Sequence, residues 1–228
     1  MFVLAGGLGT RLAHAIGDLP KALAPVAGRP FLERQIGWLS GQGLGDIVLC
    51  VGHGAEQVER AFGNGEKLGV RLQYSRETQP LGTAGALAQA RSFLLGPSLV
   101  MNGDTLAELD LWALERARWE RGAVGALALF RLDDAQASGR VECDDDGHVT
   151  RFVEKDAGHV GPAWVSGGCY AFGPELWDAL PSGASSLERD VLPGLASARQ
   201  LVGHAAEGSF WDIGTPQGLE RAERRFAS

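Results

Sequence analysis

A run of glycines directly after a short apolar segment is the feature that most restricts the fold of this chain. Phe2-Val3-Leu4-Ala5 is typical of a buried strand, and Gly6-Gly7-Leu8-Gly9 follows it at once. Glycines permit positive φ and let backbone N–H groups approach phosphate oxygens closely. The pattern indicates an α/β protein with an anion site beyond the strand, and a tight turn without a ligand is the alternative.

The residues after the glycines exclude two common nucleotide-binding loops. The dinucleotide fingerprint needs a third glycine where Leu12 stands, and no Lys-Ser/Thr pair follows as in a Walker A loop. A nicotinamide dehydrogenase is also disfavoured, because Val51-Gly52-His53 ends the second apolar run without an acidic residue. Two cations do follow the loop, Arg11 and Lys21, and they favour a triphosphate as the anion.

The first half of the chain alternates between short apolar runs and helical patterns. Expected strands cover Phe2–Ala5, Asp46–Gly52, Arg71–Ser75, Ser98–Asn102 and Val124–Phe130, and expected helices cover Phe31–Gly41, Glu56–Phe62, Thr83–Leu94 and Leu111–Glu120. This rhythm predicts a doubly wound, mainly parallel, Rossmann-like sheet with helices on both faces.

The second half is richer in strand patterns. Gly139–Cys143, Val149–Glu154 and Trp164–Phe172 read as strands, with Asp144-Asp145-Asp146-Gly147 as a hairpin turn. Expected helices cover Pro174–Leu180, Leu187–Leu195 and Pro216–Phe226. We therefore expect a small β-rich lobe on the α/β sheet, within a single domain of 228 residues.

Composition limits the partners and the compartment. The net charge of −7 disfavours nonspecific nucleic-acid binding, which needs many basic contacts to phosphates. Cys50, Cys143 and Cys169 lie too far apart for a zinc motif or a disulfide framework, as in a reducing compartment. The apolar start is too short for a signal peptide, and no stretch approaches a membrane span of about 20 residues. We expect a cytoplasmic protein.

Two aspartates are candidates for metal binding. Asp104 follows the expected strand that ends at Asn102, where ligands of open α/β sheets bind, and Mg²⁺ prefers such oxygen ligands. The alternative for Asp104 is a cap on the next helix. Asp212 lies between Trp211 and Ile213, where a charge needs a partner.

A loop with a helix start, Glu77–Gly85, is a candidate for base recognition. Gln79 offers an acceptor and a two-proton donor to a base edge, and Gly82 lets backbone groups approach a flat ring. The alternative is a plain loop with Thr83 as the helix N-cap.

Together these segments resemble the sugar-phosphate nucleotidyltransferase family. Its motifs G-G-x-G-T-R-L, P-K, P-L-G-T-A-G, N-G-D, E-K and a late aspartate occur here in the family's order, between residues 4 and 216. Within the family the chain is similar to short bacterial enzymes that join GTP and D-glycero-α-D-manno-heptose 1-phosphate. The similarity rests on Asp18–Lys21, Pro30–Leu32, Ser186–Asp190 and Phe210–Gly214.

The resemblance implies a GT-A-like sheet, GTP and a sugar 1-phosphate as substrates, Mg²⁺ as cofactor, and GDP-heptose for cell-surface glycans as product. Residues 1–135 would mainly bind the nucleotide and residues 136–228 mainly the sugar phosphate. Implied catalytic residues are Arg11, Lys21 and Asp104, and implied metal ligands are Asp104 and Asp212. Implied nucleotide-binding residues are Leu4, Ala5, Gly6, Gly7, Gly9, Thr10, Gln79, Pro80, Gly82, Thr83, Asn102 and Gly103. Implied sugar-phosphate residues are Glu154, Lys155, Ser166 and Gly168.

Two departures from the family pattern leave alternatives open. Ser166 stands where many relatives have Asn, and Gln79 stands where many guanylyl relatives have Glu, so a pyrimidine base remains an alternative. One alternative is therefore a uridylyltransferase acting on N-acetylmuramic acid 1-phosphate or a hexose 1-phosphate. A non-catalytic sugar-nucleotide-binding subunit is disfavoured, because all four implied catalytic and metal-binding residues are present. A homodimer is compatible with the resemblance.

Overall fold

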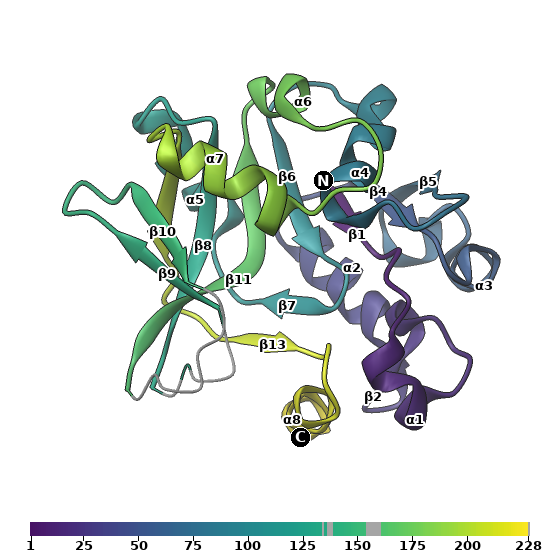
Figure 1. The fold of residues 1–228 in the computed structure, drawn as a ribbon. Coiled ribbons are helices and arrows are strands. Elements are labelled where there is room, and N and C mark those ends of the chain that lie inside the picture. Colours follow the sequence, from purple (N-terminus) through teal and green to yellow (C-terminus); the bar gives the residue numbers. More distant parts are fainter. Residues whose placement is uncertain (134, 136–138, 154–160, 228) are drawn as a thin grey trace.

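The computed structural model describes residues 1–133, 135, 139–153 and 161–227, and a nine-stranded sheet runs through the molecule (Figure 1). Its strands are β1 (Phe2–Leu4), β4 (Asp46–Val51), β5 (Arg71–Arg76), β6 (Ser98–Asn102), β8 (Gly125–Leu132), β9 (Arg140–Cys143), β10 (Val149–Val153), β11 (Ala163–Phe172) and β12 (Leu201–Ala205). The order β10-β9-β11-β6-β1-β4-β5 forms the main path, and β8 joins β11 to β12.

The strands of the first half are parallel, as the alternation of strand and helix patterns predicts. β1 lies between β4 and β6, with Phe2 opposite Val48 on one side and Val100 on the other, and β5 extends the sheet beyond β4. The connections carry the helices α2 (Phe31–Gly41), α3 (Ala55–Phe62) and α4 (Gly82–Gln89). The carboxyl ends of β1 and β6 therefore meet at one edge of the sheet.

The second half continues the same sheet with strands of mixed direction, and the reversal occurs at β11. β11 pairs antiparallel with β6 on one side and with β8 and β9 on the other, and β9 and β10 form the expected hairpin. The β-rich lobe is thus an extension of the α/β sheet and shares its core. A register shift in β11 between Ser166 and Tyr170 bends the strand beside the end of β6.

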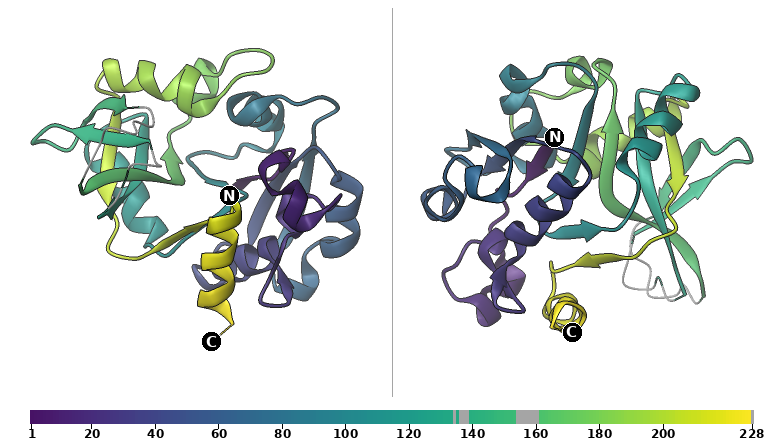
Figure 2. Two further views of the ribbon diagram at one scale, coloured as in Figure 1. Left: turned by 60° about the horizontal axis from the view of Figure 1, so that its bottom comes forward. Right: turned by 180° about the vertical axis from the view of Figure 1, so that it is seen from behind.

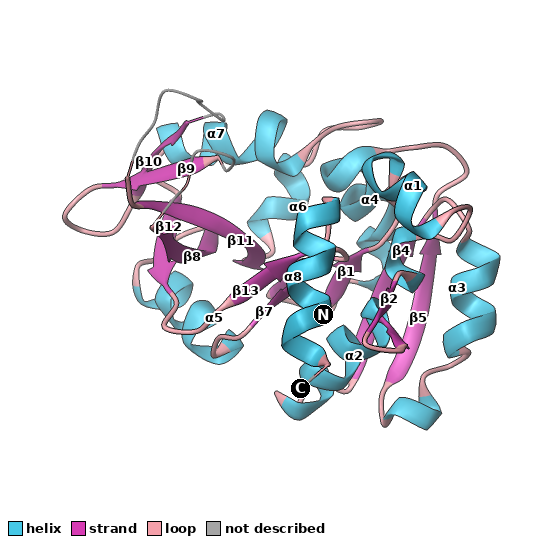
Figure 3. Ribbon diagram, turned by 90° about the horizontal axis from the view of Figure 1, so that it is seen from below, coloured by secondary structure: helices cyan, strands magenta, loops and turns pink. Residues whose placement is uncertain are grey.

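Helices lie on both sides of the sheet (Figure 3), and apolar side chains are buried against each face. One buried cluster joins one strand face to α2, α3 and α5 (Leu111–Glu120). A second joins the other face to α4, α6 (Glu175–Ala179) and α7 (Leu192–Ser197). Val3 belongs to the first cluster and its neighbour Phe2 to the second, which is the alternation expected of a strand buried on both sides.

A third apolar cluster lies under the C-terminal helix α8 (Pro216–Phe226), which packs against β13 (Phe210–Asp212) and β2 (Pro25–Val26) (Figure 2). Ile213 and Ala222 are buried in it. Thr215 caps α8, since its hydroxyl accepts from the Gly218 N–H at 3.1 Å, as the Thr-Pro sequence predicts.

Several elements differ from the sequence-based expectation. The helix expected over 187–195 begins as one wide π-type turn, Leu187–Val191, before α7, where Pro193 has no N–H to donate. The helix expected over 83–94 is α4 followed by a 3₁₀ turn, Ala90–Phe93. The sequence did not predict five further features, which are α1 (Ala13–Ile16), β7 (Thr105–Ala107), β12, β13 and the small hairpin of β2 and β3 (Arg29–Pro30). Among the described residues, no helix is both long and apolar enough to cross a membrane.

Candidate active site

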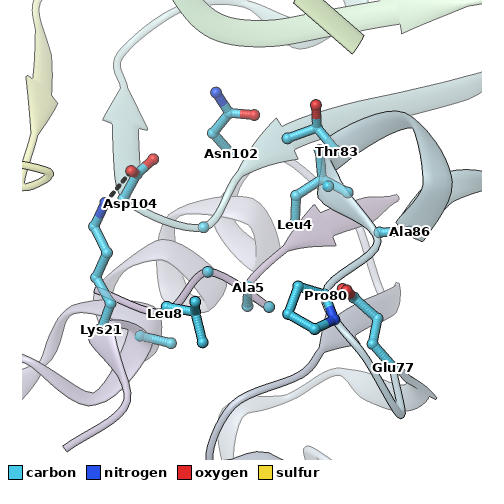
Figure 4. Close-up of a pocket in the computed structure, with 15 residues that line it drawn as sticks. Leu4, Ala5, Leu8, Lys21, Glu77, Pro80, Thr83, Ala86, Asn102 and Asp104 are labelled. Atoms are coloured by element: carbon cyan, nitrogen blue, oxygen red, sulfur yellow. Dashed lines mark hydrogen bonds and ion pairs between the residues drawn. The ribbon is translucent and has the colours of Figure 1, made fainter. Parts of the chain in front are cut away.

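A cavity of about 260 Å³ lies at the carboxyl ends of β1 and β6 (Figure 4). It is enclosed by the glycine-rich loop, the start of α4 and the turn after β6. Its lining residues are Leu4, Ala5, Gly6, Gly7, Leu8, Lys21, Ala22, Glu77, Pro80, Gly82, Thr83, Ala86, Asn102, Gly103 and Asp104. Most of the residues expected at the nucleotide therefore meet in one cavity, although they come from three separate stretches of sequence.

The glycines at this edge permit close backbone approach. A Cβ on Gly6 would lie 2.3 Å from Glu77 Oε1, and a Cβ on Gly103 would lie 2.7 Å from the Leu4 carbonyl oxygen. A side chain at Gly103 would meet backbone and force the strand ends apart, whereas a side chain at Gly6 would displace the Glu77 carboxylate. The cavity floor is consequently bare backbone.

Gly9, Thr10 and Arg11 lie beyond the cavity floor. Gly9 has a φ of +62° and turns the chain against Lys21, while Thr10 is exposed and begins a 3₁₀ turn. Arg11 faces a second cavity, described below. The structure thus separates the loop into a floor, Gly6-Gly7, and a following turn that carries a cation.

Charged side chains gather where the two cavities meet. Lys21 forms an ion pair with Asp104, shown by the dashed line in Figure 4. Asp212 joins them because β13 pairs with β7, placing Asp212 opposite Thr105, and because the Ile213 N–H donates to the Asp104 carbonyl at 2.9 Å. Asp104 does not cap the next helix, since Asp110 caps α5. The capping alternative for Asp104 is therefore wrong.

The electrostatics of this cluster suit a bound cation. Asp212 reaches the cavity surface, but the surrounding protein removes enough water to raise the pKa of its carboxyl, and the Asp104 carboxylate raises that pKa further. The Gly214 N–H, which donates to Asp212 Oδ1 at 2.5 Å, opposes the rise in pKa, and so do Lys21 and Arg11. Within the described residues, no group of three or more His, Cys, Asp or Glu side chains is arranged as a metal site. Two hard carboxylates with open positions fit Mg²⁺, which keeps phosphate oxygens and water as further ligands.

A second cavity of about 420 Å³ adjoins the first and shares Asn102 and Asp104 with it. It runs between β11, the hairpin of β9 and β10, and the π-type turn. Its lining residues are Arg11, Asn102, Asp104, Thr105, Gly139, Arg140, Val141, Phe152, Val153, Val165, Ser166, Gly168, Tyr170, Glu188, Leu192, Phe210 and Asp212. Of the implied sugar-phosphate residues, Ser166 and Gly168 line this cavity, and Glu154 and Lys155 lie outside the described residues.

The sequence profile of the nucleotidyl transferase family matches residues 1–228. The chain belongs to this family.

Known nucleotidyl transferases resemble the chain in sequence and in structure. The mannose-1-phosphate guanylyltransferase of Mycobacterium tuberculosis is 34% identical over 224 residues, which are 96% of this chain and 62% of that protein. The catalytic subunit beta of mannose-1-phosphate guanylyltransferase from Drosophila pseudoobscura is 33% identical over 94% of this chain and 59% of its own length. The chain thus spans about three fifths of these curated relatives.

Crystal structures of HddC from Yersinia pseudotuberculosis superpose over nearly the whole chain. One has a TM-score of 0.88 and 30% identity, covering 99% of this chain and 98% of that one. HddC complexed with GMP-PN has a TM-score of 0.87 at 29% identity. A putative glucose-1-phosphate thymidylyltransferase from Bacillus anthracis, with a TM-score of 0.84 at 20% identity, shares the fold.

The first cavity contains a carboxylate, Glu77, to which the sequence analysis assigned no role. Glu77 lines the first cavity, whereas Gln79, predicted to read the base, is exposed and lines neither cavity. The Leu81 N–H donates to Glu77 Oε2 at 2.9 Å, which leaves Oε1 facing Gly6. Burial raises the pKa of Glu77, and the Leu81 N–H partly offsets this. Its place directly after β5 is the sequence signal that could have found it.

Thr83 also differs from one expectation. It lies inside α4, which begins at Gly82, and so is no N-cap. Its hydroxyl donates instead to Glu188 Oε2 at 2.8 Å, a contact that crosses from the first cavity to the second. Glu188, Tyr170 and Arg140 line the second cavity without any expectation from the sequence.

Proposed function

We propose that this chain transfers a guanylyl group from GTP to a sugar 1-phosphate, giving a GDP-sugar and pyrophosphate. The observation that carries the proposal is the pair of cavities that meet at Asp104, with Lys21, Arg11 and Asp212 around the junction. The nucleotide occupies the first cavity and the sugar phosphate the second. Residues 1–135 accordingly supply most of the nucleotide contacts, and residues 136–228 most of the sugar contacts.

The chemistry is a direct in-line transfer. A phosphate oxygen of the sugar 1-phosphate attacks the α-phosphorus of GTP, and a new O–P bond forms there. The bond from the α-phosphorus to the bridging oxygen of the β-phosphate breaks, and pyrophosphate leaves with the electron pair. Lys21 and Arg11 hold the phosphates in line and offset their charge. Mg²⁺, held by Asp104 and Asp212, would supply further positive charge to the phosphate oxygens.

Guanine is the base that suits the Glu77 carboxylate. An ionised carboxylate accepts hydrogen bonds only, and the edge of guanine presents two N–H donors, N1–H and the 2-amino group. Uracil presents one N–H between two carbonyls, and the carbonyls would face a like negative charge. The guanylyltransferase names of the relatives and the GMP-PN complex of HddC support the same base.

The sugar we propose is D-glycero-α-D-manno-heptose 1-phosphate, on the resemblance to short heptose enzymes. The relatives named mannose-1-phosphate guanylyltransferases make mannose 1-phosphate the second candidate. The two sugars share the manno ring and differ by one hydroxymethylene group. We propose a cytoplasmic location, which agrees with the three free thiols of Cys50, Cys143 and Cys169.

A pyrophosphate-release assay over the four ribonucleoside triphosphates tests the proposal. Each would be paired with heptose, mannose, glucose, N-acetylglucosamine and N-acetylmuramic acid 1-phosphates. We expect turnover with GTP and a manno-configured sugar, dependent on a divalent metal. Turnover with UTP alone would overturn the guanylyl assignment. The absence of turnover with every pair would overturn the proposed transfer activity.

A further inference from the structure

A chain of hydrogen bonds joins the two cavities through Glu188. The Thr83 hydroxyl donates to Glu188 Oε2 at 2.8 Å, and the Leu187 N–H donates to the Thr83 oxygen at 2.7 Å. The Ser186 hydroxyl also donates to Glu188 Oε2, at 3.0 Å. Because Oε2 accepts two hydroxyls, the carboxylate is fixed in one orientation.

The backbone around this bond is clamped as well. The Ser185 carbonyl accepts from the N–H groups of Ala84 at 3.0 Å and Gly85 at 3.3 Å, and the Ser185 N–H donates to the Leu81 carbonyl at 2.8 Å. Gly82, with a φ of +70°, approaches so closely that a Cβ would lie 2.5 Å from the Ser185 oxygen. The segment that carries Glu188 is therefore fastened to the start of α4, which lines the nucleotide cavity.

The other oxygen of Glu188 belongs to the second cavity. The Tyr170 hydroxyl donates to Oε1 at 3.3 Å, a long bond that leaves acceptor capacity on this oxygen. Tyr170 is buried, and the Ser166 hydroxyl oxygen in the same cavity accepts from the Gly168 N–H at 3.3 Å. Tyr170, Ser166 and Glu188 all line the cavity, so Oε1 is an oriented acceptor at its wall.

We propose that Glu188 Oε1 accepts a hydroxyl of the sugar 1-phosphate, and that the bond from Thr83 to Oε2 sets the sugar relative to the nucleotide. This inference rests on the proposed function. It assigns to Glu188 the recognition of an uncharged, hydroxyl-bearing sugar, and to Thr83 a positioning role across the two cavities.

The variant Glu188→Gln separates recognition from folding. Its amide oxygen can take the place of Oε2 and keep the hydroxyls of Thr83 and Ser186, while its NH₂ group faces Tyr170, whose hydroxyl can accept. The network survives, but the acceptor facing the sugar becomes a donor. We expect the KM for the sugar 1-phosphate to rise about tenfold or more, with the KM for GTP unchanged. The matched control is Glu120→Gln, on the exposed end of α5, which should change neither KM.

Three measurements decide the inference. Calorimetric titration of mannose 1-phosphate into wild type and Glu188→Gln needs no turnover, and equal affinities would overturn the assignment to Glu188 even if the enzyme is active. The same titrations with mannose 1-phosphates that each lack one hydroxyl identify the contact. Wild type and Glu188→Gln should bind one of these analogues with equal affinity, namely the one that lacks the hydroxyl bound by Glu188. If the variant binds every analogue more weakly than wild type by the same factor, the role of Glu188 is structural. Thr83→Val should raise the KM for the sugar by a smaller factor, whereas an effect on GTP alone would remove the link between the cavities.

Discussion

Glu77 carries a negative charge where burial opposes it. Its pKa is raised because the walls of the first cavity exclude water, and the single Leu81 N–H does not compensate fully. A glutamine would keep the bond from Leu81 without the charge. The charge therefore destabilises the empty protein, and under the proposed function the binding of a donor-rich base offsets that cost.

We expect Glu77→Gln to be more stable than wild type at pH 7 and less selective for GTP over UTP. The folded-state pKa of Glu77 is raised, so its destabilising effect is full above that pKa and absent below the ordinary glutamate value, about 4.3. Urea unfolding should therefore give a higher free energy of unfolding for the variant at pH 7 and equal values near pH 3.5. A variant that is less stable at pH 7, or that keeps full selectivity, would contradict this assignment.

Asp104 lines both cavities. Asp104→Asn should reduce kcat by a factor of about 100 or more, because the ion pair with Lys21 and the metal-binding charge are lost together. The fold should persist, since the pair is partly exposed and such pairs contribute about 1 kcal/mol or less. Steady-state kinetics and circular dichroism measure the two effects. Asp110→Asn is the matched control, because asparagine caps α5 as well as aspartate does; a similar loss of activity there would make the Asp104 effect nonspecific.

Among the individual residues, the sequence predicted those that follow β6 but missed Glu77, which follows β5, and Glu188, which meets the cavity through packing. Asn102, Gly103 and Asp104 could be located because parallel strands end at a common edge. Glu188 lies in a turn whose local pattern shows nothing about the cavity, and only the contact with Thr83, 105 residues away, reveals it. The roles of the individual residues stay predictions until variants are measured.

Helix α2 supports the turn that carries Asp104 through one buried side chain. Gln35 Nε2 donates to the carbonyl oxygens of Asn102 at 2.7 Å and Thr105 at 2.5 Å, so it spans both sides of Asp104. Gln35→Leu leaves both carbonyls without this donor. We expect a loss of about 1–3 kcal/mol in the free energy of unfolding and a lower kcat, measured by urea unfolding and by pyrophosphate release. Gln57→Leu, on the exposed face of α3, is the control; full activity in Gln35→Leu would mean that the turn holds Asp104 unaided.

Gly82, at the start of α4, lies in close contact with the backbone of Ser185. Gly82→Ala must adopt a positive φ, which costs a non-glycine residue about 1–2 kcal/mol, and must also push Ser185 away. Gly43→Ala is the matched control, because its φ of +82° brings the same conformational cost with no atom within 4 Å of the new Cβ. Thermal unfolding should show a larger loss for Gly82→Ala, and only that variant should raise the KM for the sugar. Equal losses would show that the contact with Ser185 adds nothing.

Among the helices and the small strands β7 and β13, the length of an element decided whether its bounds could be predicted from the sequence. The helices 31–41, 111–120 and 216–226 have the expected bounds, because ten or more residues display a helical period. β7 and β13 have three residues each and no period of their own, so they form only as partners across the chain. That pairing brings Asp212 to Asp104, and it could not be read from either segment alone.

The whole molecule should unfold as one unit, although its two halves have different topologies. β11 is hydrogen-bonded to β6 of the first half and to β8 and β9 of the second, and the apolar clusters cross the same boundary. Tryptophan fluorescence and far-ultraviolet circular dichroism should give coincident transitions in urea. Saturation with MgGTP at about 100 times its Kd should shift both by about 2.7 kcal/mol. Two separate transitions, or a shift in one probe alone, would contradict a single cooperative core.

Eight of the nine strands of the sheet were predicted and β12 was not, and the strand directions were only partly predictable. The parallel order of β1, β4, β5 and β6 follows from the helical crossovers between them. The reversal at β11 depends on which strand takes the free edge of β6, and that edge is compatible with either direction. The division of the chain into a nucleotide part and a sugar part, and a homodimer, stay predictions.

The central position of β1 sets an order of events during synthesis. Its neighbours β4 and β6 come from residues 46–51 and 98–102, and Asp212 must still arrive by way of β13. At a translation rate of about 5–20 residues per second, the first strand waits several seconds for its second neighbour, and the cavity junction waits about 10–40 s. Until β6 has been synthesised, the apolar strand Phe2-Val3-Leu4 has an unpaired edge, so the nascent chain needs protection from association after β1 has left the ribosome.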